Sequence, residues 1–189
     1  MVLSVTIEIP KNSNIKYEYD RETGKISVDR ILYGPSVYPQ NYGFLPEALD
    51  WDGDPLDVIV FADQAFMPGI IVPSRIIGAM EMIDNGETDT KLIAVIDCDP
   101  RWKHVNSLKD INPHELAVIK DFFETYKRLQ NKTVFVDKFQ DIDWAINDYK
   151  VCVDLMKKYG KMDKEKFIAE MKKKHPEKYP EEKPKASKK

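Results

Sequence analysis

Six short segments with the residue pattern of β-strands fill the first half of the chain, and no helical pattern separates them. They are apolar or alternate apolar with polar residues, and they are rich in Val, Ile and Tyr. Turn residues lie between them, and the stretches 20–24 and 84–86 are typical of hairpin loops. This order favours a mostly antiparallel barrel over a parallel sheet with crossover helices. The predicted strands are 2–9, 15–19, 25–32, 56–61, 70–82 and 91–97.

Helical patterns come only in the second half. Asn112 and Pro113 supply an N-cap and a first helical position, and Glu115 completes a capping box. A strand at 132–139 follows, then a helix from residue 141 or 143 to Gly160 and a shorter one over 163–175. The class is therefore α+β, a small barrel with helices packed on it. The apolar faces are predicted from Leu116, Ile119, Phe122, Phe123, Tyr126 and Leu129 on the first helix and from Ile146, Tyr149, Val153 and Met156 on the second.

Length and composition suit one globular domain with an added tail. The chain has 189 residues, of which 42% are hydrophobic and 32% are charged, and such a chain can bury a core. No apolar run approaches the roughly 20 residues that cross a bilayer, so no membrane partner is expected. We expect a single domain over residues 1–160 and a Lys-rich extension over 161–189. The extension would be a short helix and then a disordered stretch from Pro176.

The start of the chain and its cysteines indicate a cytoplasmic protein. Glu8 follows too soon after Met1 for the apolar region of a secretory signal. Cys98 and Cys152 are far apart and have no metal-ligand spacing, so reduced thiols are expected.

Charge is divided unevenly along the chain. The net charge is −3, with +5 on residues 161–189 and −8 on residues 1–160. This balance argues against nucleic acid as the main partner. An acidic body that handles an anion must recruit cations or position a few basic side chains.

The stretch 52–57 is the most informative part of the sequence. Asp52, Asp54 and Asp57 repel one another, and gathering them usually requires a cation, for which their oxygens suit Mg²⁺, Mn²⁺ or Ca²⁺. A solvated acidic turn is the ordinary alternative. An EF-hand loop counted from Asp50 fails, because Pro55 stands where glycine is required and no glutamate stands at position twelve.

Further charged residues indicate a functional site only in combination with this aspartate cluster. Asp84 and Asp89 surround the second predicted hairpin, and Lys91 follows closely. The chain has neither of the glycine-rich phosphate loops, so side chains would have to hold an anion. Taken singly, each candidate could equally be a strand face or part of the core. The candidates are Lys16, Arg30, Tyr38, Tyr42, Tyr126 and Lys127.

Other hydrolytic chemistries lack their motifs. The three histidines do not form HExxH or another tight ligand spacing, so a zinc hydrolase is not indicated. No G-x-S-x-G elbow is present, and neither cysteine has a histidine placed to activate it.

Taken together and in order, the motifs resemble the family I soluble inorganic pyrophosphatases of bacterial type. The match runs from about residue 3 to 158, and D-G-D-P-x-D is specific in itself. The motifs are Ile7-Glu8-Ile9-Pro10, Lys16-Tyr17-Glu18, Val28-Asp29-Arg30, Tyr38-Pro39-x-Asn41-Tyr42-Gly43, Asp52-Gly53-Asp54-Pro55-x-Asp57, Asp84…Asp89-x-Lys91 and Phe122-Phe123-Glu124-x-Tyr126-Lys127.

The resemblance implies a five-stranded OB-like barrel with flanking helices, and hydrolysis of pyrophosphate with several Mg²⁺ ions. It implies that Asp54 is the general base or orients the attacking water, and that Glu18 and Tyr38 support the direct ligands. The implied metal ligands are Asp52, Asp57, Asp84 and Asp89, with Glu8 near a further metal that arrives with the substrate. The implied phosphate ligands are Lys16, Arg30, Tyr42, Lys91, Tyr126 and Lys127.

Two positions depart from the family pattern. Bacterial members often have a histidine on each side of Phe-Phe-Glu at a subunit contact, and this chain has Asp121 and Thr125 there. A homo-oligomer, a hexamer by resemblance, is expected, but its subunit contact differs here.

Two other functions stay open: a silent member that only binds phosphate or a cation, and a phosphatase acting on nucleotides or larger esters. We expect removal of 161–189 to leave catalysis nearly unchanged, unless Phe167, Ile168 and Met171 dock on the core.

Overall fold

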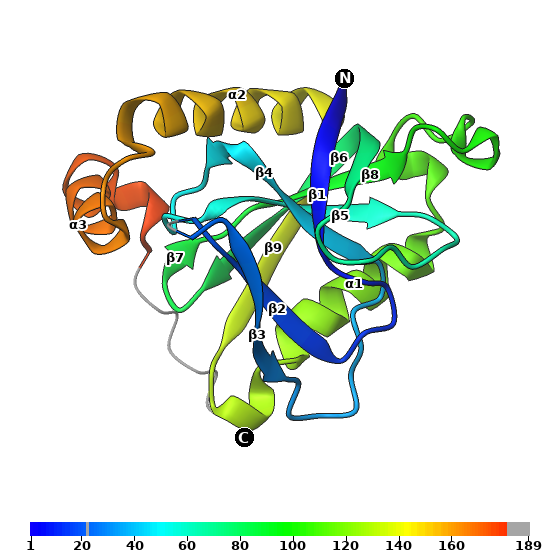
Figure 1. Ribbon diagram of the computed structural model, residues 1–189, viewed down its shortest axis with the longest axis horizontal. Helices are drawn as coiled ribbons and strands as arrows, with labels where there is room; N and C mark the ends of the chain where they lie inside the picture. Colours follow the sequence, from blue (N-terminus) through cyan, green and yellow to red (C-terminus); the bar gives the residue numbers. More distant parts are fainter. Residues whose placement is uncertain (22, 181–189) are drawn as a thin grey trace.

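Five strands of the computed structural model, which describes residues 1–21 and 23–180, close into a barrel (Figure 1). Neighbouring strands follow the order β1–β4–β5–β8–β6, and β6 pairs back with β1. Only β5 and β8 run parallel among these pairs, which confirms the predicted α+β class and mostly antiparallel barrel. The barrel strands are β1 (Val2–Ile9), β4 (Asn41–Leu49), β5 (Pro55–Phe61), β6 (Ile71–Asp84) and β8 (Lys91–Ile96).

The described part of the chain has four further strands, which lie on or beside the barrel. β2 (Ile15–Asp20) and β3 (Lys25–Ile31) form a separate antiparallel hairpin. β7 (Glu87–Thr88) folds back on the end of β6, and β9 (Val134–Gln140) pairs with the same part of β6. The turn from β6 to β7 consists of Asn85 and Gly86, both with positive φ, which is the backbone of a tight hairpin. The predicted turn at 84–86 is therefore confirmed.

Strand β4 was not predicted, because Gly43 and Pro46 interrupt its sequence pattern. A Cβ atom on Gly43 would lie 2.3 Å from the backbone oxygen of Thr6, so only glycine lets β1 and β4 approach this closely. The pairing of β4 with β5 shifts between Leu45 and Leu49, and Pro46 is exposed within that irregularity. A proline is tolerated at such a bulge because no ladder hydrogen bond is lost there.

Within the described residues, three α-helices cover the barrel, and each begins at an acidic or amide cap. Asn112, Asp141 and Asp163 accept hydrogen bonds from the first-turn amides of their helices. In Figure 1, α2 crosses the barrel on the side opposite α1, and α3 lies beside the end of α2. The helices are α1 (Pro113–Thr125), α2 (Ile142–Tyr159) and α3 (Lys164–Lys174), and the 3₁₀ helices are η1 (Pro100–Trp102), η2 (Leu108–Asp110), η3 (Arg128–Gln130) and η4 (Pro176–Lys178).

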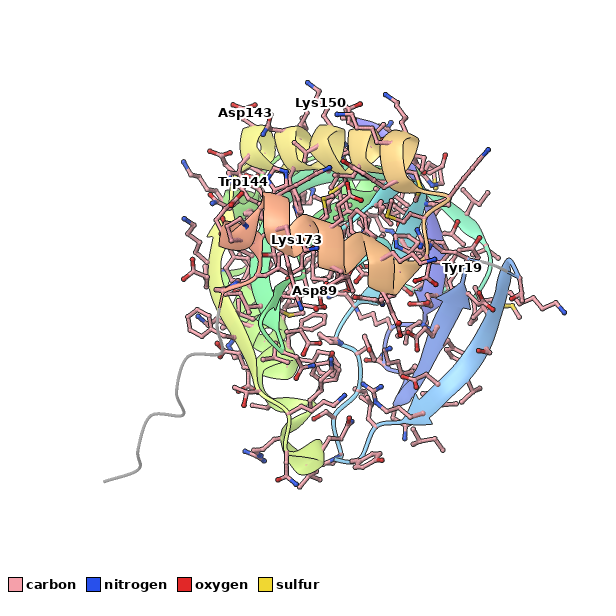
Figure 2. All side chains as sticks on the ribbon, turned by 90° about the vertical axis from the view of Figure 1, so that its left-hand side faces the viewer. Tyr19, Asp89, Asp143, Trp144, Lys150 and Lys173 are labelled. Carbon is pink, nitrogen blue, oxygen red and sulfur yellow. The ribbon has the colours of Figure 1, made fainter. Side chains whose placement is uncertain are left out.

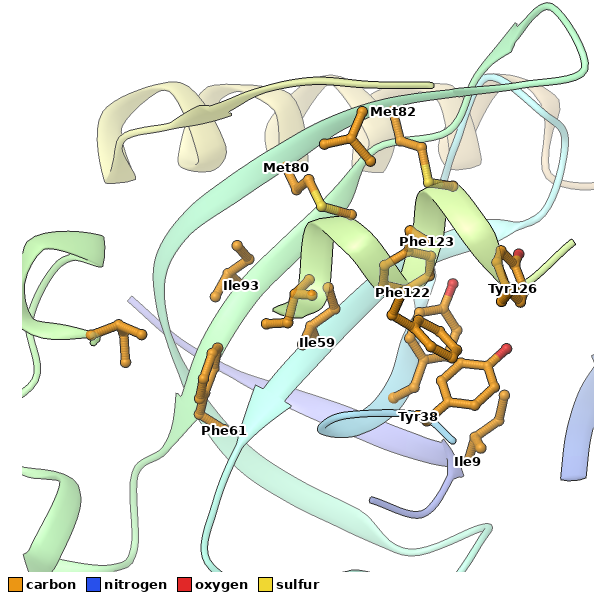
Figure 3. Close-up of a cluster of buried hydrophobic side chains, with 14 of the residues drawn as sticks. Ile9, Tyr38, Ile59, Phe61, Met80, Met82, Ile93, Phe122, Phe123 and Tyr126 are labelled. Atoms are coloured by element: carbon orange, nitrogen blue, oxygen red, sulfur yellow. The ribbon is translucent and has the colours of Figure 1, made fainter. Parts of the chain in front are cut away.

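Alternation along the strands divides the core between the two helical sides. On β5, Leu56, Val58 and Val60 belong to the cluster that also contains Ala145 and Cys152 of α2. The intervening Ile59 and Phe61 belong to the cluster that contains the aromatic residues of α1 (Figure 3). Successive strand residues point to opposite faces, so Asp57 points to the α1 side of the sheet. The same alternation that builds the core therefore places the candidate site residue Asp57.

The C-terminal extension packs on the domain. Phe167 and Met171 of α3 are fully buried against Leu49, Trp51 and Leu155. The expectation that removal of 161–189 leaves catalysis nearly unchanged excepted the case in which these side chains dock on the core, and Phe167 and Met171 do dock there.

The residues after α3 continue this attachment. Pro176–Lys178, predicted to be disordered, form the turn η4, and the hydroxyl of Tyr179 donates to the backbone oxygen of Trp51 at 2.5 Å. The rest of the predicted disordered stretch, 181–189, lies outside the described residues. Within the residues that the structure describes, none of the helices is long and apolar enough to span a membrane.

Candidate active site

All but one of the predicted site residues line a single pocket of about 250 Å³. The pocket lies among β1, β2, β4, β5, β8, the β6–β7 turn, the end of α1 and the start of α3. The predicted residues in its wall are Glu8, Lys16, Glu18, Tyr38, Tyr42, Asp52, Asp54, Asp57, Asp84, Asp89, Lys91, Tyr126 and Lys127. Sequence analysis did not select the remaining wall residues, which are Tyr19, Phe44, Pro55, Asn85, Glu87 and Lys164.

The centre of the pocket is an ion cluster fixed by strand register. Asp57 on β5 lies opposite Lys91 on the parallel strand β8, and the Lys91 ammonium contacts the carboxylates of both Asp57 and Asp89. Burial would lower the pKa of Lys91, but the charges of Asp57, Asp89 and Asp52 outweigh it and raise that pKa well above its usual value. Burial raises the pKa of Asp57, against the opposing effect of Lys91. Lys91 therefore remains charged between the two acids.

A tight turn presents Asp52 and Asp54 to the pocket. Gly53 has a φ of +83°, a conformation that suits glycine. Its amide donates to the backbone oxygen of Asp50 at 3.0 Å. The Asp52 carboxylate accepts a hydrogen bond from the Asp54 amide at 3.0 Å. Burial raises the pKa of Asp52, and the nearby charges of Asp89 and Asp54 raise it further. The turn thus gathers acids that repel one another.

Asp50 supports this turn from behind. Its carboxylate accepts from the amide of Trp51 at 2.8 Å and from the amide of Thr90 at 3.0 Å. Burial, followed by the charge of Asp52, raises the pKa of Asp50 well above its usual value. Sequence analysis considered Asp50 only as the first position of an EF-hand, and the structure makes it the link between the two acidic segments.

The β6–β7 turn and the end of α1 supply the opposite wall. Lys127 follows the C-cap residue Tyr126 of α1, and its ammonium contacts Asp84 at the end of β6. Burial lowers the pKa of Lys127, although Asp84 opposes that effect. The second oxygen of Asp84, Oδ1, is buried and has no hydrogen-bond partner among the described atoms.

Glu8 and Lys16 form the wall nearest the β2–β3 hairpin. The Glu8 carboxylate accepts from the amide of Tyr19 at 2.5 Å, and burial, followed by the charge of Asp57, raises the pKa of Glu8 to about 8. The Lys16 ammonium lies 3.2 Å from Asp29 and 3.5 Å from Glu18.

Arg30 is the predicted site residue that does not line the pocket. It pairs in register with Lys16 across the hairpin, and its Nη1 lies 2.5 Å from Asp29. Its Nε is buried and has no hydrogen-bond partner within 1–21 and 23–180. The Lys16 ammonium contacts the same oxygen of Asp29, so the guanidinium lies beside Lys16 although it is not part of the pocket wall.

Three buried tyrosines bring phenol groups to the pocket. The ring centroids of Tyr38 and Tyr42 are 5.4 Å apart, and those of Tyr38 and Tyr126 are 6.5 Å apart. Burial raises the pKa of all three phenols. They therefore stay protonated and can donate hydrogen bonds to anionic oxygens without adding charge. These rings belong to the α1 core cluster, so the predicted alternative of a core residue holds for them, and they also line the pocket (Figure 3).

The donor set fits hard divalent cations. Among the described residues, eight acidic side chains and four lysines line the pocket, and carboxylate oxygens are the ligands that Mg²⁺ and Ca²⁺ prefer. The unpartnered Oδ1 of Asp84 is one such oxygen. In the same part of the chain, no three His, Cys, Asp or Glu side chains form a ready-made ion site. Lys91 and Lys127 instead hold Asp57, Asp89 and Asp84 in ion pairs, so cation binding there would require these two lysines to turn toward another anion.

Asp121 and Thr125, the two positions that depart from the resemblance, lie on α1, where Asp121 is exposed and Thr125 is half-buried. The Thr125 hydroxyl donates to the backbone oxygen of Asp121 at 2.6 Å. The two positions are thus used within the helix, away from the pocket.

Comparison with known proteins agrees with this geometry. The family model described as inorganic pyrophosphatase matches residues 5–157. The inorganic pyrophosphatase of Malacoplasma penetrans is 69% identical over 179 residues, covering 95% of this chain and 99% of its own length. A solved structure of the Helicobacter pylori enzyme has a TM-score of 0.80 and 45% identity, and it covers 82% of this chain and 94% of its own. The chain belongs to the inorganic pyrophosphatase family.

Proposed function

We propose that this chain hydrolyses inorganic pyrophosphate to two orthophosphates at the pocket described above, with Mg²⁺ as the activating ion. The observation that carries the proposal is the arrangement of one lysine between Asp57 and Asp89 and a second lysine beside Asp84. Pyrophosphate is a small, dense anion, and its hydrolysis requires both cation ligands and phosphate ligands within a few ångströms. The pocket offers both kinds of ligand on facing walls.

The residues that would hold the ions are Asp52, Asp57, Asp84 and Asp89, with Glu8 beside a further ion that arrives with the substrate. Bound divalent ions supply positive charge at the phosphate oxygens and make an attacking water more acidic. The carboxylates of this chain orient those ions, and their number supports more than one. Glu8, whose pKa is raised to about 8 by burial and by Asp57, would give up its proton when positive charge arrives.

The residues that would bind phosphate oxygens surround this acidic floor. Lys91 and Lys127 exchange their carboxylate partners for phosphate oxygens, and Lys16 and Arg30 approach from the hairpin. Tyr42 and Tyr126 donate phenol hydrogen bonds that carry no charge penalty. Glu18, which lies 3.5 Å from the Lys16 ammonium, and Tyr38, which packs between the other two tyrosines, hold these ligands in place.

Asp54 is the group that we assign to the attacking water. Its carboxylate is paired with Lys164 rather than with Lys91 or Lys127, and its side chain is 41% exposed at the edge of the pocket. A general base must reach the water that it activates and must be able to exchange the proton with solvent. Both requirements suit a carboxylate at the edge of the pocket rather than on its floor.

Two alternative functions make different predictions. A silent member of the fold would bind phosphate or a cation without turnover. A phosphatase of broader range would accept nucleotides or sugar phosphates. The present volume of about 250 Å³ and the charged lining favour a small substrate.

One experiment separates these functions. Phosphate release is measured from pyrophosphate, ATP and a sugar phosphate, each with Mg²⁺, Mn²⁺, Ca²⁺ or EDTA. We expect turnover of pyrophosphate with Mg²⁺ and little on the other substrates. No release from pyrophosphate under any metal would leave only the binding function, and equal rates on ATP would make the enzyme a broader phosphatase.

The cellular setting is part of the same proposal. We assign the chain to the cytoplasm, since both cysteines are free thiols.

We also propose a homo-oligomer, supported by Met67, Ile70 and Ile71, which are large apolar side chains exposed close together in sequence. Light scattering would show a mass well above 21.9 kDa, and a monomer at micromolar concentration would rule out this assembly.

A further inference from the structure

We propose that the C-terminal extension completes the active site, with Lys164 of α3 acting as a positioning residue for Asp54. The inference deepens the proposed function and rests on it. Helix α3 begins after the last residue that the family model matches, residue 157. The extension nevertheless reaches the pocket, and Lys164 is part of its wall. Figure 2 looks onto the side that carries α3, which lies between α2 and the labelled Asp89.

The first contact is the ion pair between the two side chains. The Lys164 ammonium lies 2.5 Å from Oδ2 of Asp54. Within residues 1–21 and 23–180, no other side chain contacts the Asp54 carboxylate at hydrogen-bond distance. The hydrogen bonds of Asp54 to Asp50 and Asp52 involve its backbone, so they fix the turn and leave the side-chain torsions free. Lys164 is therefore the group that sets the direction of this carboxylate.

The position of Lys164 does not depend on the ion pair. Asp163 caps α3 by accepting from the amides of Glu165 at 3.1 Å and Lys166 at 3.3 Å, which fixes the first turn of the helix. The buried side chain of Phe167 holds that turn against the domain. The Lys164 stem lies beside Gly53, where an added Cβ would be 3.0 Å from Cγ of Lys164. Packing thus aims the ammonium at Asp54.

The extension also touches the second acidic segment. Lys172, two turns further along α3, lies 3.1 Å from Glu87 in the β6–β7 region that carries Asp84. The Tyr179 hydroxyl binds the backbone of Trp51, next to the turn that carries Asp52. One helix therefore joins both edges of the pocket, and Lys164 is the side chain that it directs inside.

Stability does not account for the Lys164–Asp54 pair. The two side chains are 46% and 41% exposed, and ion pairs exposed to solvent stabilise a fold little. Orientation of a general base, in contrast, is sensitive to small displacements, and about 1 Å of misplacement can cost about 100-fold in rate. The Lys164–Asp54 contact adds little to stability but fixes the angle of the Asp54 carboxylate. We therefore expect its loss to lower kcat rather than the melting temperature.

The first test compares three lysine variants in the full-length protein. Lys164→Met keeps the stem and removes the charge, Lys164→Arg keeps the charge, and Lys166→Met alters an exposed lysine two residues away. We expect Lys164→Met to lower kcat about 10- to 100-fold with KM within about twofold of wild type. Lys164→Arg should recover most of the loss, and Lys166→Met should match wild type. All should melt within a few degrees of wild type.

A double-mutant cycle then distinguishes positioning from direct substrate binding. If Lys164 acts through Asp54, Lys164→Met should cost nothing more in an Asp54→Asn background. An equal loss in both backgrounds, or a large rise in KM, would mean that Lys164 binds phosphate itself and would overturn the positioning role. An unchanged kcat in Lys164→Met would overturn it as well.

A crystallographic readout keeps the inference separate from the proposed function. Structures of wild type and Lys164→Met at one pH should show the Asp54 carboxylate rotated or spread over several rotamers in the variant, with the 50–54 backbone unmoved. An Asp54 carboxylate that stays in place refutes the inference whatever the activity. A wild-type protein that releases no phosphate from pyrophosphate refutes the proposed function instead.

Discussion

The buried carboxylate of Asp50 accepts a hydrogen bond from the backbone amide of Thr90 at 3.0 Å, although 40 positions separate the two residues. The same carboxylate accepts from Trp51. One bond therefore lies on each acidic segment, just before Asp52 and just after Asp89. A side chain that is 2% exposed sets the distance between segments whose own charges repel.

Replacing Asp50 should thus harm both stability and turnover. Asp50→Ala leaves two buried amides without partners, and each unsatisfied group costs about 1–3 kcal/mol. We expect urea denaturation to show a loss of at least about 2 kcal/mol and kcat to fall, because Asp52 and Asp89 move apart. Asp137→Ala, at an exposed position of β9, is the control and should match wild type. A fully stable Asp50→Ala protein would deny Asp50 this linking function.

Asp54 and Asp57 should fail in different ways when each becomes asparagine. Asp54→Asn keeps the shape of the turn and removes the base, so turnover should fall by roughly 10²–10⁴-fold with little change in the Mg²⁺ requirement. Asp57→Asn removes a charge from the floor beside Lys91, so metal affinity should fall and added Mg²⁺ should restore part of the activity. Metal titrations of both variants at fixed pH decide between the assignments. Rescue of Asp54→Asn by Mg²⁺, with none for Asp57→Asn, would exchange the two functions.

Asp148 on α2 should make stability depend on pH. Burial raises the pKa of Asp148 from 3.8 to about 6, against the opposing charge of Lys178, and its Oδ2 has no hydrogen-bond partner among the described residues. The folded protein therefore holds this proton more tightly than the unfolded chain. Stability falls as pH rises from about 4 to about 6, and the full cost is present above pH 6.

The variant Asp148→Asn removes that cost because the amide carries no charge. We expect it to be more stable than wild type by about 1–3 kcal/mol at pH 7.5, with the difference vanishing near pH 4. Asp143→Asn, in the exposed first turn of the same helix, should show no such pH dependence. A gain of the same size at both pH values would attribute the effect to packing rather than to ionisation.

Truncation after Gly160 should lower the melting temperature markedly. It removes Phe167 and Met171 and exposes Leu49, Trp51 and Leu155 to water. Burial of one large apolar side chain contributes about 1.5–3 kcal/mol, so the two lost side chains alone should cost roughly 3–6 kcal/mol. Truncation after Pro180 is the matched control and should melt like the full-length protein. Equal melting temperatures for both truncations would show that the cluster adds nothing.

The strands and helix starts were predictable because their signals are local. Alternating apolar residues mark β1, nearly continuous apolar runs mark β5 and β8, and a capping side chain stands before each α-helix. Strand β4 was not predicted because the reasons for Gly43 and Pro46 lie in neighbouring strands. Gly43 allows the close approach of β1, and Pro46 lies at the bulge in the pairing with β5. Such tertiary reasons leave no periodic pattern in the sequence.

The buried face of α2 shows a second limit of sequence patterns. The prediction chose Ile146, Tyr149, Val153 and Met156, which the structure places on the half-buried flank. The fully buried positions include the small residues Ala145 and Cys152, because they let the helix lie close to the barrel. Leu129, predicted as part of the α1 face, is 60% exposed beyond the end of that helix.

The acidic floor of the pocket could be predicted because its aspartates are dense in sequence and match a specific motif. The placement of Lys164 could not, because its distance from Asp54 in sequence is 110 residues and nothing near it marks a functional site. The structural function of Asp50 was also missed. Asp50 stands among the aspartates of the candidate site, but its carboxylate binds backbone amides. Arg30 was chosen by motif, and although it pairs in register with Lys16, its guanidinium binds Asp29 and does not line the pocket.

Asp57 and Lys91 are paired across the parallel strands β5 and β8. The register that closes the barrel is therefore the same register that brings these two pocket side chains together. A slip of one residue between β5 and β8 would turn either Asp57 or Lys91 to the opposite face of the sheet. The misplaced charge would then enter the apolar layer beneath α2, where Val58 and Leu92 belong. A misaligned chain would thus be too unstable to persist, so the cell would hold few folded but inactive copies of this protein.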